Sequence, residues 1–181
     1  GVCGVPREAA AELYRQGEAA GLARRGVIAG SGREQAEMWA LRERIPEANR
    51  RIGAIASHDI SLPLSQIGPF LDEAGQALAR LAPGLRINCF GHLGDGNLHY
   101  NAFPARGESR DRYEPIRASV SRAVHDLVHE FGGSVAAEHG VGRLKVADLE
   151  RYADPGKLEA MRRLKQAFDP LGILNPGAVL A

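Results

Sequence analysis

The segment GHLGDGNLHYN at residues 91–101 constrains the fold more than any other part of the 181-residue chain. Three glycines lie within six positions, which excludes a helix there. They predict a tight hairpin whose backbone can approach a bound group closely. His92 precedes the turn and His99 follows it, so a hairpin brings the two imidazoles together.

The patterns around this hairpin predict a ferredoxin-like unit. Strand patterns cover residues 52–60, 85–90, 98–103 and 134–138, and helical patterns cover residues 63–81 and 111–131. Their order is β-α-β-β-α-β, which folds as an antiparallel sheet with both helices on one face. We therefore expect an α+β fold of the ferredoxin-like βαββαβ type, with additional N- and C-terminal helices.

The additional helices are predicted over residues 6–25, 31–49 and 154–168. The second begins with a capping box, buries a stripe formed by Met38, Leu41 and Ile45, and is ended or kinked early by Pro46. Between the first two helices, the apolar residues 27–29 predict a strand with an unpaired edge. Such an edge can pair with a second copy of the chain, which predicts a homodimer.

Composition excludes several classes of protein. With 23 basic and 22 acidic residues the net charge is +1, which argues against a general nucleic-acid binder. No apolar run is long enough to span a membrane. Cys3 and Cys89 are the only cysteines, so a disulfide scaffold or a cysteine-based zinc site is excluded. The chain opens at Gly1 and continues directly into helical sequence, so we interpret it as a fragment of a longer protein.

Side-chain alternation places the candidate site on one face of the sheet. His99 and Asn101 share a face, and the apolar Tyr100 points to the opposite face, under the helices. The same test places Glu138 on the face of His99. Two imidazoles and one carboxylate converging on an open face predict a catalytic zinc-type site formed by His92, His99 and Glu138. Manganese or ferrous iron suits these ligands as well.

Two other interpretations compete with a redox enzyme. The unit can be a non-catalytic ferredoxin-like module that binds a metal or small ligand, or a metal hydrolase, although the chain has no helical H-E-x-x-H motif. The remaining histidines, His58, His125 and His129, receive no support as ligands. His125 and His129 are four residues apart on a predicted helix, which favours a solvated pair.

Three motifs, GHLGDGNLHYN, SVAAEHGVGRLK and FDPLGILNPG, resemble signatures of the C-terminal domain of FAD-linked 2-hydroxyacid dehydrogenases. That family includes D-2-hydroxyglutarate dehydrogenase, flavin-type D-lactate dehydrogenase and the glycolate oxidase large subunit. The likeness covers essentially the whole chain, including MWALRE at 38–43 and SHDISLP at 57–63. It implies that residues 1–181 form a single domain, the substrate or cap domain of a larger flavoenzyme of the vanillyl-alcohol-oxidase type. The N-terminal FAD-binding domain of that enzyme is absent from this sequence.

The resemblance also implies an activity. The complete enzyme oxidises a small D-2-hydroxy acid, or glycolate, to the 2-oxo acid by hydride transfer to FAD, with a divalent metal and a histidine base at the substrate site. The isolated fragment is expected to be inactive. The electron acceptor is a quinone, a cytochrome or an electron-transfer flavoprotein. We expect a cytoplasmic protein of bacterial type, peripheral to the membrane only through its electron acceptor.

Matching positions carry the family's site residues onto this chain. The implied metal ligands are His92, His99 and Glu138, the implied catalytic base is His139, and the implied substrate contacts are Arg42 and Asn101; Asn175 lies in a turn that returns towards the flavin.

Two positions depart from the family pattern. Ser57 stands where many relatives have a lysine, and Pro46 stands where D-2-hydroxyglutarate dehydrogenases tend to have a threonine. Both changes remove a group that can bind a second, distal carboxylate. The resemblance therefore implies a 2-hydroxy acid as the substrate class without specifying 2-hydroxyglutarate.

Overall fold

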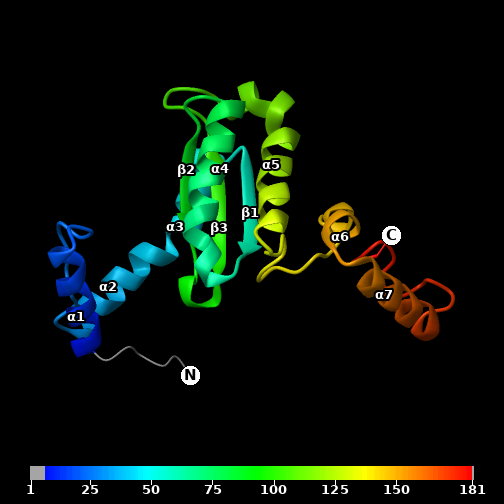
Figure 1. Ribbon diagram of the computed structural model, residues 1–181, viewed down its shortest axis with the longest axis horizontal. Helices are drawn as coiled ribbons and strands as arrows, with labels where there is room; N and C mark the ends of the chain where they lie inside the picture. The colour runs from blue at the N-terminus through cyan, green and yellow to red at the C-terminus, as the bar shows by residue number, and fades with distance from the viewer. Residues whose placement is uncertain (1–6, 181) are drawn as a thin grey trace. The chain divides into compact units, whose positions relative to one another are not determined.

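The computed structural model describes residues 7–180 of the chain, which divides into two compact units, residues 1–51 and residues 52–181. The first unit is helical, and the second contains the sheet with its helices (Figure 1). The α+β fold class predicted from the sequence is therefore confirmed.

The first unit consists of α1 (Arg7–Ala19), α2 (Gly32–Glu43) and most of α3 (Ile45–Ile52). The Ser31 hydroxyl accepts a hydrogen bond from the backbone N–H of Glu34, so the predicted cap of α2 is confirmed. The predicted break is also confirmed, because α2 ends at Glu43 and Pro46 lies in the first turn of α3.

One prediction for this unit is wrong. The stripe on α2 is not buried, since Met38 is 36% exposed and Leu41 is 67% exposed. Residues 27–29 are not paired as a strand within the described residues. The homodimer inferred from their unpaired edge stays a prediction.

The second unit is built on three antiparallel strands, β1 (Ala56–Ser61), β2 (Arg86–Phe90) and β3 (Asn97–Phe103), in the order β1-β3-β2 among the described residues. One face of the sheet is covered by α4 (Ile67–Leu81) and α5 (Arg117–Glu130), which lie side by side (Figure 1). Three short 3-10 helices connect these elements. One precedes α4 (Leu64–Gln66), one forms the hairpin turn (Leu93–Asp95), and one precedes α5 (Arg110–Ile116).

The main core lies between these helices and the sheet, as the alternation pattern predicts. Its buried residues are Ala56, Ile60 and Leu62 on and after β1, Leu98, Tyr100 and Ala102 on β3, Ile67, Phe70, Ala74 and Leu78 on α4, Val120, Val124 and Val128 on α5, and Val135. The two helical stripes recur every three or four residues, which fixes the face that each helix presents to the sheet.

The segment predicted as a fourth strand runs beside β1 but forms only one bridge with it in the described structure. Ser61 and Ser134 exchange two backbone hydrogen bonds, of 2.9 and 2.8 Å. Further along, the backbone N–H groups of Glu138 and His139 donate instead to the side chain of Asp59. The N–H of Ala136, the next donor of a regular ladder, bonds to the Ser134 hydroxyl. The N–H of Ala137 donates to the carbonyl of Asp59 at 3.3 Å, so the regular ladder does not continue.

Two helices follow this segment, α6 (Val146–Tyr152) and α7 (Pro155–Phe168). The sequence predicted α7, and the Asp154 carboxylate caps it by accepting from the N–H of Lys157 at 2.9 Å. The sequence analysis missed α6, which has only seven residues. Within the described residues, no helix combines the length and the apolar character that a membrane crossing requires.

Replacing Gly96 by alanine is expected to destabilise the protein by at least about 2 kcal/mol. Gly96 has a φ of +71°, and a Cβ atom there would lie 2.2 Å from the carbonyl oxygen of Leu62. Urea unfolding followed by circular dichroism measures the loss. Gly94→Ala in the same turn is the control, because a Cβ atom there would meet only open space in the described structure. Equal stability of the two variants would contradict the prediction.

Candidate active site

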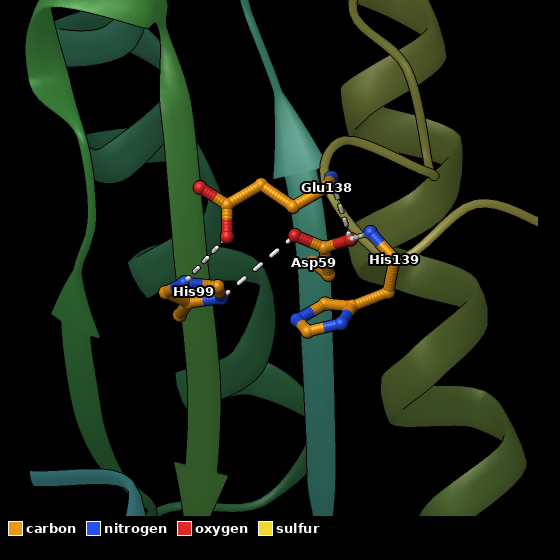
Figure 2. A group of neighbouring side chains, drawn as sticks. All are labelled: Asp59, His99, Glu138 and His139. Carbon is orange, nitrogen blue, oxygen red and sulfur yellow. Dashed lines mark hydrogen bonds and ion pairs between the residues drawn. The ribbon is translucent and has the colours of Figure 1, made fainter. Parts of the chain in front are cut away.

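Several polar residues of the sheet, Asp59 and His99 among them, face away from α4 and α5. Asp59 of β1 pairs with His99 of β3 in the sheet register. Their neighbours Ile60 and Leu98, which point the other way, belong to the core beneath the helices. Asp59 and His99 therefore lie next to each other on the face that the helices leave open (Figure 2).

Glu138 brings the two predicted histidines into one cluster. Its Oε1 atom lies 3.6 Å from Nε2 of His92, and its Oε2 atom lies 3.5 Å from Nε2 of His99. His139 joins the cluster, because its ring centroid lies 6.0 Å from that of His99. The structure thus brings His99, Glu138 and His139 into one group, with His92 beside Glu138 but outside that group, and the chemical roles of these residues stay predictions.

Asp59 is the member of the cluster that the sequence analysis missed. Its Oδ1 atom lies 3.8 Å from Nδ1 of His99, and its Oδ2 atom accepts hydrogen bonds from the N–H groups of Glu138 (3.0 Å) and His139 (2.9 Å) (Figure 2). The signal was present in the SHDISLP motif, because pairing this strand with residues 98–103 puts an aspartate beside His99.

The surroundings of Asp59 keep it ionised. Burial alone would raise the pKa of its carboxyl group. The N–H groups of His139 and Glu138 and the nearby charge of Lys145 outweigh burial, so the pKa lies below its ordinary value. Lys145 also holds the segment in place, since its Nζ donates to the backbone carbonyls of Asp59 (3.3 Å) and Val135 (2.8 Å).

The cluster suits a divalent cation. Asp59, His99, Glu138 and His139 each offer one nitrogen or oxygen atom, and these atoms lie within 4.8 Å of one another. The buried Oδ1 atom of Asp59 has no hydrogen-bond partner among the described residues. Mixed imidazole and carboxylate donors are typical of zinc, manganese and iron sites. The residues present therefore fit a metal ion.

Exposure varies across the cluster. The side chains of His92 and Glu138 are 54% and 41% exposed, whereas those of His99 and Asp59 are 19% and 10% exposed. The inner part of the cluster, His99 and Asp59, is therefore largely buried against the sheet. The outer part, the open rim formed by His92 and Glu138, can be reached by a small molecule.

The other predicted site residues lie in three places. Asn101 shares the face of His99 but is 6% exposed, and its Nδ2 donates to the backbone carbonyls of His99 and Asn88. Asn175 accepts a 3.0 Å hydrogen bond from Arg143, which joins the C-terminal turn to the loop after His139. Arg42 lies on α2, in the unit of residues 1–51.

The prediction that His125 is solvated is wrong. His125 is 8% exposed, and its Nε2 atom lies 3.1 Å from Nδ1 of His58, which is 4% exposed. The Nδ1 atom of His125 lies 3.1 Å from a carboxylate oxygen of Asp148 on α6. Two buried histidines and the partly buried Asp148 thus form a chain of hydrogen bonds on the helix side of the sheet. His129 is exposed, as predicted.

Comparison with known proteins identifies the family. The family model described as "FAD linked oxidases, C-terminal domain" matches residues 4–179. The chain belongs to this family. The resemblance stated from the three motifs is therefore confirmed, and with it the association with FAD-linked oxidoreductases.

Similar curated proteins carry the name D-2-hydroxyglutarate dehydrogenase. The one from Stutzerimonas stutzeri is 36% identical over 86% of this chain, and the mitochondrial one from Bos taurus is 40% identical over 88% of this chain. The mitochondrial protein from Arabidopsis thaliana is 35% identical over 88% of this chain. These matches cover 33%, 28% and 27% of the relatives, so the chain spans about a third of their length or less.

Proposed function

We propose that this chain is the substrate domain of an FAD-dependent dehydrogenase that oxidises a small D-2-hydroxy acid, or glycolate, to the 2-oxo acid. The observation that carries the proposal is the position of the Glu138 carboxylate between the imidazoles of His92 and His99, in a chain of the FAD-linked oxidase family. The relatives named D-2-hydroxyglutarate dehydrogenase support the substrate class. The proposal includes an N-terminal flavin domain, for which the greater length of these relatives leaves room.

His92, His99 and Glu138 are the proposed ligands of a divalent cation. In each histidine the Nε2 atom lies within 3.6 Å of one oxygen of the carboxylate, and a rotation of the exposed His92 side chain would let both imidazoles bind one ion. When bound, such a cation makes a hydroxyl group that it contacts more acidic. The open rim formed by His92 and Glu138 leaves room for the α-hydroxyl and α-carboxylate of a substrate.

His139 is the proposed base that removes the proton of the α-hydroxyl. Its backbone N–H is fixed by Asp59 while the residue is exposed, so the point from which the ring projects is fixed and the ring is accessible to a substrate. As the C–H bond breaks, the α-carbon becomes a carbonyl carbon, and the hydroxyl proton passes to the imidazole. FAD, when bound, accepts the hydride.

We propose substrate and flavin contacts at three further positions. Arg42 has the planar guanidinium group that binds a carboxylate through two parallel hydrogen bonds. Asn101 lies on the site face of β3, and its amide oxygen is still available as an acceptor after its NH₂ group bonds to the backbone. Asn175 is the proposed flavin-side contact in the C-terminal turn.

The proposal is tested with the full-length protein reconstituted with FAD. Reduction of a redox dye is followed with glycolate, D-lactate, D-malate and D-2-hydroxyglutarate. We expect turnover with at least one of these acids. A flavin-loaded protein that oxidises none of them would contradict the proposal and favour a non-catalytic binding module.

His139→Asn is expected to lower kcat by about a hundredfold to ten-thousandfold, because the base that accepts the proton is lost. KM changes much less, since the carboxylate contacts remain. His129→Asn is the matched control, because His129 is exposed on α5. If His139→Asn retains the kcat of the unmodified enzyme, the proton is accepted elsewhere.

A further inference from the structure

Asp59 contacts three separate parts of the candidate site through one carboxylate. Its two oxygens face the backbone N–H groups of Glu138 and His139 and the Nδ1 atom of His99. The residue is only 8% exposed, so water does not compete strongly for these contacts. A buried carboxylate that is aimed at the backbone of two proposed site residues and the ring of a third requires an explanation.

We propose that Asp59 is a positioning residue, which sets the tautomer of His99 and fixes the backbone that presents Glu138 and His139. The inference deepens the proposed function and depends on it for its chemical meaning.

The tautomer of His99 follows from the charges on its two sides. Nδ1 faces the Asp59 carboxylate at 3.8 Å, and Nε2 faces Glu138 at 3.5 Å. A neutral imidazole carries its proton on one of its two nitrogens, and each carboxylate attracts that proton to the ring nitrogen that faces it. Asp59 is the more buried of the two carboxylates, so its field is screened less by water. The proton is therefore held on Nδ1, and the lone pair of Nε2 is free to bind a cation.

The second role concerns the segment of residues 134–139. Besides the bridge at Ser134, the N–H of Ala137 donates to the backbone carbonyl of Asp59 at 3.3 Å, and Lys145 joins the carbonyls of Asp59 and Val135. The bridge between Ser61 and Ser134 ends its regular pairing. Beyond that bridge, Asp59 Oδ2 accepts the N–H groups of Glu138 and His139 together. One oxygen atom thus fixes the two peptide units from which the proposed ligand and the proposed base project (Figure 2).

The geometry favours positioning over direct binding of the ion by Asp59. Oδ2 already accepts two hydrogen bonds, and Oδ1 faces the nitrogen of His99 that is turned away from Glu138. A carboxylate behind a ligating imidazole is a recurring arrangement in metal sites, and its removal costs about 10- to 100-fold in metal affinity.

Asp59→Asn separates the two roles. The amide oxygen of the new side chain can still accept the N–H groups of Glu138 and His139, but its NH₂ group then faces Nδ1 of His99. The anion that favoured a proton on Nδ1 is then gone, so we expect the proton to move to Nε2 and block its lone pair. Asp59→Ala removes both roles. Asp72→Asn is the matched control, because it makes the same change at an exposed position on α4.

The measurement uses the full-length protein in its metal-free form, with histidines labelled in both ring nitrogens. At about pH 8.5, two units above the ordinary pKa of histidine, the ¹⁵N shifts report the tautomer of His99. We expect the Nδ1–H form in the unmodified protein and the Nε2–H form in Asp59→Asn. Hydrogen exchange at the amides of Glu138 and His139 should stay slow in Asp59→Asn and become fast in Asp59→Ala.

Competition between the protein and a chromogenic chelator for Zn²⁺ provides the second readout. Asp59→Asn should weaken Zn²⁺ binding by about 10- to 100-fold, and Asp72→Asn by less than about twofold. An unmodified protein with the proton on Nε2 of His99, or Asp59→Asn with unchanged affinity, would overturn the inference. If the unmodified protein binds no Zn²⁺ or Mn²⁺, the metal in the proposed function is refuted, and the tautomer still decides the role of Asp59.

Discussion

Replacement of Glu138 by glutamine is expected to lower kcat/KM of the full-length enzyme by at least about a thousandfold, because a cation that acidifies a reacting hydroxyl contributes several kcal/mol. The Glu138 carboxylate lies within 3.6 Å of both His92 and His99, so it joins the other two proposed ligands. A neutral amide of the same shape loses the charge that holds a divalent ion between the imidazoles. Dye reduction with the best acid substrate measures the effect.

Metal content distinguishes this explanation from a folding defect. Glu138→Gln should retain the circular dichroism spectrum and bound FAD of the unmodified protein but lose its divalent metal, as measured by mass spectrometry of the digested sample. Glu130→Gln is the matched control, because Glu130 is exposed at the end of α5. Full metal content with full activity in Glu138→Gln would refute the metal assignment.

The hairpin and its two histidines could be predicted because the signals are local. Glycine spacing excluded an α-helix around residue 94, where the structure has a short 3-10 turn. Strand alternation placed His99 on the face opposite to that of Tyr100, which is buried at 1% exposure. The helices α4 and α5 were predicted for the same reason, since their apolar residues recur at helical spacing within each segment.

The fourth strand could not be predicted correctly because its outcome depends on a side chain far away in the sequence. Val135 and Ala137 alternate as they would in a strand. The N–H of Ala136, the next donor of a regular ladder, bonds to the Ser134 hydroxyl. Asp59, which precedes this segment by more than 70 residues, accepts the N–H groups of Glu138 and His139. Local alternation carries no information about such a competitor.

The error at His125 has the same origin. A histidine on a helix is usually partly exposed, and the spacing to His129 favoured a polar face. The partner that buries His125 is His58, which comes from a strand 67 residues earlier. The helical pattern of α5 alone cannot reveal a hydrogen bond across the core. The pair of His58 and His125 also affects the stability of the protein in acid.

Stability of the protein is expected to fall steeply in mild acid because of His58. Burial, together with the charges of His125 and Lys145, lowers the pKa of His58 from 6.5 to about 3. Between these values the unfolded chain binds a proton that the folded chain does not, so stability falls as pH falls. The contribution of this group is about 1.4 kcal/mol per pH unit, and it vanishes above the unfolded pKa.

Comparison of unfolding free energies at several pH values between about 4 and 7.5, in the unmodified protein and in His58→Asn, isolates this contribution. Asparagine keeps a polar group where Nδ1 meets His125, but it does not titrate. The variant should be less stable at neutral pH, because part of the ring is lost from the core. Its stability should nevertheless decline less steeply in acid, by about 1.4 kcal/mol per pH unit.

The difference between the two proteins removes the effect of other acid-sensitive groups, including Asp59, whose lowered pKa also makes acid destabilising. His129→Asn makes the same chemical change on the exposed side of α5 and should follow the unmodified protein at every pH. Asp148 and Lys145 also lie near the pair, and both stay unchanged in each variant.

If the unfolding free energies of His58→Asn and the unmodified protein decline equally with falling pH, His58 accepts its proton in the folded state. The chain from His58 through His125 to Asp148 would then have to open without unfolding, which its burial between β1, α5 and α6 opposes.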